Sequence, residues 1–117
     1  MRHLAKGKKF HRKRGDRTAF IKGLISNLAL YKKIETTEAR AKEIKRIMEK
    51  AVTLAKKQNL ASLKLLIGRF GEKAAFEIFH KIAPKCQKRP GGYLRIIQSP
   101  RLRKRDAAKM VIIGFVD

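Results

Sequence analysis

The chain has 117 residues, 44% of them hydrophobic, and its 31 Lys and Arg residues stand against nine Asp and Glu residues, for a net charge of +22. This is one domain's worth of sequence, and self-repulsion of that charge would oppose compaction unless a counter-charged partner is present. No apolar run approaches the ~18 residues of a membrane span, and a single cysteine, Cys86, excludes an intrachain disulfide framework.

The first seventeen residues hold eight Lys and Arg residues and one acid, and Leu4 and Phe10 are their only large apolar side chains after Met1. Such a segment buries too little apolar surface to offset its ordering entropy. We therefore expect residues 1–15 to form a basic arm that is disordered when free and ordered on nucleic acid. With Arg17 just beyond it, the arm supplies these candidate RNA-binding residues: Arg2, His3, Lys6, Lys8, Lys9, Phe10, His11, Arg12, Lys13, Arg14 and Arg17.

Residues 16–117 are predicted to form a single domain. Asp16 is a suitable N-cap for a first helix, whose apolar residues recur at helical spacing from Phe20 to Tyr31. Residues 33–36 are too few for a helix and predict an extended link or short strand. Thr36 or Thr37 then caps the longest helix, whose apolar stripe runs to Ala55.

Two shorter helices are predicted next. The first carries apolar residues from Leu60 to Phe70 and ends at Gly71, because glycine tolerates a left-handed cap conformation. The second carries them from Ala75 to Ile82 and is expected to stop at Pro84, which cannot continue the hydrogen-bond ladder.

The pattern changes after Pro84. A loop over residues 85–92 precedes a strand at 93–97, and a second loop at 99–106 precedes an apolar strand at 109–116. Two consecutive strands predict an antiparallel hairpin with its basic residues at the tip. The fold class is therefore α+β, with four helices packed on a small sheet that includes this C-terminal hairpin.

Basic side chains in the loops extend the predicted RNA-binding surface, since Arg adds bidentate phosphate contacts and stacking. Tyr93 is a candidate for stacking on a base, although packing against a helix is the stronger interpretation for a strand aromatic. The candidate residues outside the arm are Lys85, Lys88, Arg89, Tyr93, Arg95, Arg101, Arg103, Lys104 and Arg105.

Nothing in the sequence indicates an enzyme. The three histidines and Cys86 have no metal-ligand spacing, and no phosphate-binding glycine motif occurs. The acids are few and mostly lie in predicted helices, where ion pairing accounts for them. We therefore expect no catalytic residues, no metal, no cofactor and no small-molecule substrate.

Several short motifs, weak singly but specific together, occur in one order along the whole chain. The motifs are Met1-Arg2-His3, Ile34-Glu35-Thr36-Thr37, Ala39-Arg40-Ala41-Lys42-Glu43, Thr53-Leu54-Ala55-Lys56, Ile82-Ala83-Pro84, Gly91-Gly92-Tyr93-Leu94-Arg95-Ile96 and Asp106-Ala107-Ala108-Lys109-Met110. Taken together, they make the sequence resemble the bacterial-type large-subunit ribosomal protein family conventionally numbered seventeen.

The resemblance implies a non-enzymatic structural component of the large ribosomal subunit, near the nascent-chain exit. Its partners would be large-subunit ribosomal RNA and neighbouring large-subunit proteins, in a cytoplasmic ribosome or an organellar one. The sequence departs from the family at Arg105-Asp106 and Lys109-Met110, which make the hairpin tip more basic, and at Phe10-His11. The alternative from charge alone is an architectural DNA-binding or nucleoid protein, for which no dimer stripe or recognition helix is evident.

Overall fold

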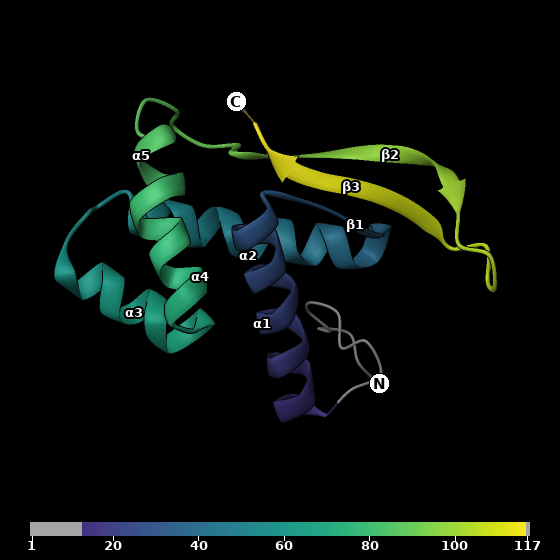
Figure 1. Cartoon of the computed structure of the whole chain (residues 1–117), viewed down its shortest axis with the longest axis horizontal. Helices are drawn as coiled ribbons and strands as arrows, with labels where there is room; N and C mark the ends of the chain where they lie inside the picture. Colours follow the sequence, from purple (N-terminus) through teal and green to yellow (C-terminus); the bar gives the residue numbers. More distant parts are fainter. Residues whose placement is uncertain (1–12, 117) are drawn as a thin grey trace, which may run out of the picture.

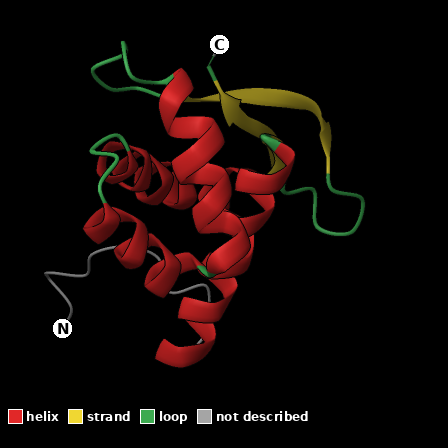
Figure 2. Ribbon diagram, turned by 60° about the vertical axis from the view of Figure 1, so that its left-hand side comes forward, coloured by secondary structure: helices red, strands yellow, loops and turns green. Residues whose placement is uncertain are grey.

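The computed structural model describes residues 13–116 and confirms the predicted α+β class. Helix α2 lies across one face of a three-stranded antiparallel sheet, whose strand order is β1-β3-β2, and the other helical segments pack on α2 and on one another (Figures 1 and 2). The elements in chain order are α1 (Arg14–Tyr31), β1 (Lys33–Thr37), α2 (Glu38–Ala55), α3 (Leu60–Phe70), α4 (Glu72–Phe76), η1 (Glu77–Ile82), α5 (Ala83–Lys85), β2 (Leu94–Leu102) and β3 (Lys109–Phe115).

Helix α1 begins at Arg14, and its N-cap lies three residues before the predicted one, Asp16. Lys13 takes the N-cap position in an extended conformation and makes no side-chain capping bond. Asp16 instead lies in the first turn, where a carboxylate also interacts favourably with the helix dipole. The predicted boundary between arm and domain, after residue 15, therefore falls inside this helix.

Residues 33–37 form a full strand of the sheet. Lys32 ends α1 in the left-handed conformation, with φ 68°, and its N–H donates to the Leu28 carbonyl at 2.8 Å. The chain thereby turns directly into β1, which pairs with β3 and not with the next strand along the chain. The short extended link predicted here is thus an edge strand, held by the far end of the sequence.

The helix predicted to stop at Pro84 continues to Lys85, so that prediction was wrong. Residues 72–85 form one continuous helical segment in which η1 is π-helical. Because proline has no N–H to donate, the wider turn before it lets the segment pass through Pro84 without the α-helical bond that proline would break. At the preceding junction Gly71 ends α3 with φ 90°, a conformation that favours glycine as predicted.

The core lies between α2, the other helices and the inner face of the sheet. Alternating residues of the strands point inward, and Val111 and Ile113 of the central strand β3 are buried. The largest fully buried side chains are Tyr93, Ile25, Leu28, Ile44, Met48, Leu66, Ile78, Ile113, Val52 and Val111.

Strand β2 runs to Leu102, well beyond the predicted end at residue 97. A register irregularity between Gln98 and Leu102 lets the strand bend and stay paired with β3. Pro100 is tolerated because β2 is an edge strand, which can spare one N–H donor. Arg101 therefore lies on the strand, and only residues 103–108 form the tip of the hairpin.

Candidate nucleic-acid interface

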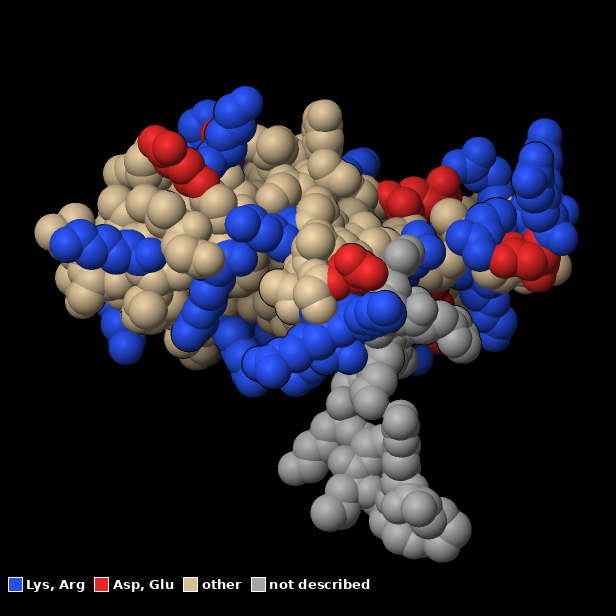
Figure 3. Space-filling model, turned by 90° about the horizontal axis from the view of Figure 1, so that it is seen from below, with Lys and Arg blue, Asp and Glu red and all other residues tan. Residues whose placement is uncertain are grey.

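The predicted basic groups lie at three separate corners of the molecule. The start of α1, the loop after α5 and the β2–β3 hairpin project in different directions (Figure 1). On the face seen in Figure 3, Lys and Arg side chains are widely spread and dense at the hairpin end, whereas acidic side chains are few. The arm candidates Arg2, His3, Lys6, Lys8, Lys9, Phe10, His11 and Arg12 lie outside the described residues.

Cations crowd the start of α1. Lys13 and Arg14 are exposed and Arg17 is half-buried, all within the first turn or at its cap. Positive side chains are electrostatically unfavourable at a helix N-terminus, where the dipole is itself positive. This arrangement therefore favours a neighbouring anion, and Asp16 is the only acid in that turn.

Two of the four hairpin cations are held by carboxylates. Arg101 Nη2 donates to Glu35 Oε1 at 2.6 Å, which links β2 to the other edge strand across β3. Arg103 forms a two-pronged pair with Asp106, with Nε donating to Oδ1 at 2.9 Å. Arg101 and Arg103 thus help to shape the hairpin.

The Arg103 pair persists at every physiological pH. Hydrogen bonds from the Arg103 guanidinium and from the Ala108 N–H lower the pKa of Asp106 to about 2. A group whose pKa is depressed on folding stabilises the fold above its ordinary pKa and loses that effect as the pH falls through the depressed value. The hairpin tip should therefore keep its shape at any pH well above 2.

Lys104 and Arg105 are the hairpin cations with no hydrogen-bond or ion-pair partner among residues 13–116. Both are exposed at the tip, between the paired Arg103 and Asp106. Arg95 is exposed on β2 and likewise has no such partner within the described chain. These side chains are open to an external anion, whereas Arg101 and Arg103 would first have to leave their carboxylates.

The loop after α5 is fastened by a lysine that sequence reasoning missed. Lys56, at the end of α2, donates to the Arg89 carbonyl at 2.6 Å and to the Tyr93 hydroxyl at 3.1 Å. Gln87 Nε2 donates in turn to the Lys56 carbonyl at 3.0 Å. Lys85 is exposed at the end of α5, and Lys88 is exposed on the loop that these bonds position. Nothing in the spacing of Lys56 distinguished it from the other helix cations.

Tyr93 does not offer its ring to RNA in this structure. Its side chain is 1% exposed, packed in the core with the Lys56 ammonium 5.0 Å from the ring centroid. The candidate base-stacking role was wrong because the two glycines before Tyr93 turn the chain inward, so that its ring fills space between helix and sheet. Hydrogen bonds from Thr53 and Lys56 lower the pKa of its hydroxyl.

We expect Tyr93→Phe to lower the free energy of unfolding by about 1 kcal/mol, the typical net worth of one hydrogen bond, without changing RNA affinity at low salt. Urea denaturation and a filter-binding titration measure the two quantities. A tyrosine that contacted RNA would show the reverse pattern, with affinity falling and stability unchanged.

Within residues 13–116 no group of three or more His, Cys, Asp or Glu side chains could hold a metal ion. Cys86 is a free, buried thiol, and burial raises its pKa. No helix in this part of the chain is long enough and apolar enough to cross a membrane.

Comparison with known proteins identifies the family. The model for "Ribosomal protein L17" matches residues 20–116. The large ribosomal subunit protein bL17 of Bdellovibrio bacteriovorus is 44% identical over 98% of this chain, which spans 64% of that relative's length. The bL17 proteins of Persephonella marina and Hydrogenobaculum are 44% and 37% identical over the whole chain, which spans 96% and 100% of their lengths.

The chain belongs to the ribosomal protein L17 family. The predicted resemblance is thereby confirmed, and with it the prediction of a non-enzymatic ribosomal protein. Family membership also removes the support for a nucleoid protein.

Proposed function

We propose that this L17 protein is a structural constituent of the large ribosomal subunit and binds the subunit's RNA through its arm and its basic corners. The observation that carries the proposal is the placement of exposed cations at separate corners of one small domain. A duplex-tracking protein would align its cations along one stripe, whereas a protein wedged between RNA segments needs them on several sides. A location near the nascent-chain exit rests on the family resemblance.

Neighbouring large-subunit proteins are the second class of partner that we propose. On the sheet face turned away from the helices, Ile97 and Ile112 are cross-strand neighbours, and Ile97 is 59% exposed. Leu102, farther along β2, is 57% exposed. An apolar strip of this kind, flanked by Arg95 and Lys33, suits a protein surface better than bare phosphate.

Sedimentation tests the proposal. A tagged chain should co-sediment with large subunits, and large-subunit RNA should be recovered with it after washing at moderate salt. Recovery of DNA fragments in place of ribosomal RNA would support the nucleoid alternative and contradict the proposal. A chain that sediments alone would contradict both.

The hairpin provides a matched mutational test. Lys104→Gln/Arg105→Gln should reduce the slope of log K against log salt by about 1.5, because each phosphate contact releases about 0.7–0.9 counterion. Arg101→Gln/Arg103→Gln removes equal charge but should change the slope by less than about 0.5, since those guanidiniums are already engaged by Glu35 and Asp106.

Both hairpin variants should be measured by titration on large-subunit RNA and on an unrelated structured RNA. The hairpin cations Arg101, Arg103, Lys104 and Arg105 have no Asn or Gln side chain among them for base-edge readout. The loss of affinity should therefore be similar for the two RNAs. A loss confined to the ribosomal RNA would contradict this positioning role.

A further inference from the structure

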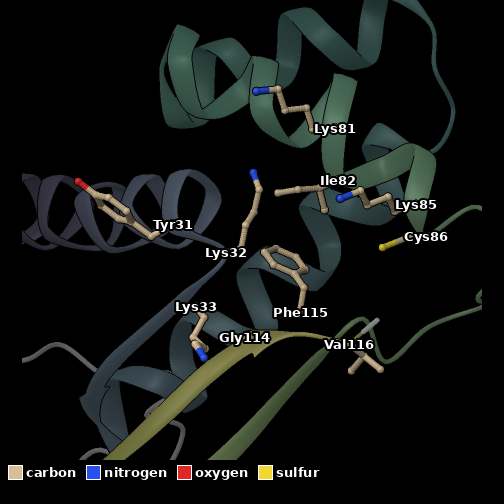
Figure 4. A pocket seen from close by; sticks show the side chains of 10 residues that line it. All are labelled: Tyr31, Lys32, Lys33, Lys81, Ile82, Lys85, Cys86, Gly114, Phe115 and Val116. Atoms are coloured by element: carbon tan, nitrogen blue, oxygen red, sulfur yellow. The ribbon is translucent and has the colours of Figure 1, made fainter.

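A pocket opens where three distant parts of the chain meet. The end of α1, the segment formed by η1 and α5, and the end of β3 enclose a volume of about 640 Å³ (Figure 4). It lies away from the hairpin tip, and none of the interactions described above fills it. Its lining combines an apolar floor with several lysines.

The floor is made of side chains that already belong to the core or its margin. Ile82 is 4% exposed, and Phe115 packs against the core while remaining half-buried. Figure 4 shows the Phe115 ring and Ile82 between Lys32 and Lys85. The floor thus offers an aromatic face and aliphatic groups beside cations.

The cations are partly fixed in place. Lys32 and Lys81 both pair with Glu77, at 2.8 and 3.0 Å. Hydrogen bonds from Lys32 and Lys81 lower the pKa of Glu77, so that its single negative charge holds two ammonium groups. Lys33 and Lys85 also line the pocket and have no ion-pair partner among residues 13–116. Among residues 13–116, four lysines and one carboxylate at the pocket give it a local excess of positive charge.

We propose that this pocket receives one nucleotide extruded from RNA, with its base on the Phe115 and Ile82 floor and its flanking phosphates on Lys81 and Lys85. The inference rests on the proposed RNA-binding function and names a subsite within it. A base supplies the flat π-face that an aromatic floor accommodates, and an unpaired nucleotide can be splayed out of its stack. The volume suffices for one nucleotide.

The chemistry disfavours the main competing occupants. A continuous duplex would place phosphates over the lysines but leave the apolar floor in water. An acidic peptide would satisfy the lysines, yet its carboxylates have no flat apolar group attached to cover Phe115. A nucleotide satisfies both parts of the lining with one unit.

The test uses the full chain and large-subunit ribosomal RNA transcribed with 4-thiouridine. Lys81→Gln/Lys85→Gln is compared with Lys57→Gln/Lys64→Gln, which removes the same charge from exposed lysines that do not line the pocket. The pocket variant should reduce the salt slope by about 0.8, which is the contribution of the unpaired Lys85, because Lys81 is already engaged by Glu77. The control should reduce the slope by less than about 0.3. Cross-linked peptides of the unaltered chain should include residues 109–116 or 82–88, and the pocket variant should reduce those cross-links at least threefold.

Equal salt slopes for the two variants, with no cross-links to the pocket peptides, would overturn the proposal while leaving RNA binding by the hairpin and arm intact. Failure of the unaltered chain to bind RNA would instead contradict the proposed function itself. Normal RNA binding by the pocket variant, with loss of its incorporation into large subunits, would assign the pocket to a protein neighbour and also overturn the proposal.

Discussion

Deleting residues 1–12 should flatten the dependence of log K on log salt by about 2–4 units. The segment holds five basic residues, Arg2, Lys6, Lys8, Lys9 and Arg12, and no acid. If between half and all of them contact phosphate, each contact releases about 0.7–0.9 counterion. A change of this size alters the affinity by about 10²–10⁴ relative to the full chain over one decade of salt, which is the largest functional effect expected of any single region.

The deletion should leave the folded domain intact. Helix α1 begins at Arg14, so its ladder is preserved, whereas a cut after residue 15 would remove part of the first turn. Far-UV circular dichroism should therefore change little. The control is a full-length chain in which the same five residues are changed to Gln. This control should show the same reduced salt slope as the deletion variant. An unchanged slope in both variants would mean that the segment takes no part in binding, and the RNA interface would then rest on the three corners alone.

The body should still bind RNA without the arm. Most of the excess charge lies after residue 12, and the exposed Lys104 and Arg105 at the hairpin tip and Lys88 in the loop after α5 remain. We expect the arm's loss to weaken incorporation into large subunits more than binding to isolated RNA, because incorporation requires contacts on several sides at once.

Local periodicity was sufficient to predict most of the helices. Helix α3 occupies residues 60–70 as expected, because its apolar spacing and the Gly71 that follows it agree. The structure adds an N-cap that was not predicted, since Asn59 accepts from the Ser62 N–H at 2.8 Å. Where local signals agree in this way, tertiary packing does not change the secondary structure that the local sequence favours.

Predictions from single residues were less successful. Pro84 is a strong stop signal on its own, but the preceding π-helical turns remove the conflict that would have ended the helix. Likewise residues 99–102 were predicted as loop but belong to strand β2, whose edge position tolerates Pro100. In both places the outcome depends on backbone geometry set by packing, which a sequence window does not contain.

In the candidate site too, some features could be predicted from the local sequence, whereas others depend on how the chain packs. Charge density located the basic hairpin and loop, but it could not distinguish Arg103, which pairs with Asp106, from its unpaired neighbour Lys104. It also gave no sign of the pocket, because Lys32, Lys85 and Phe115 are brought together only by the pairing of β1 with β3 and by the helix that passes through Pro84.

The sheet that positions the hairpin provides the largest expected effect on stability. Ile113 of the central strand is fully buried and pairs in register with Ile34 on one side and Ile96 on the other. Ile113→Ala should lower the free energy of unfolding by about 2–5 kcal/mol, from lost burial and the cavity left behind. That is a large part of the ~5–15 kcal/mol typical of a whole domain.

Ile112 is the matched control, since it is the next residue on the same strand and points to the opposite face. Ile112→Ala makes the same change in strand propensity and should lower the free energy of unfolding by no more than about 1 kcal/mol. The difference in unfolding free energy between the two variants therefore reports the burial of Ile113 against the helices. Urea denaturation should be run near 0.5 M salt, where most of the self-repulsion of the +22 chain is screened. Equal losses of unfolding free energy in the two variants would show that the outer sheet face is also covered in solution. The apolar strip of Ile97 and Ile112 would then be an interface between copies of the chain and not a surface for a ribosomal neighbour.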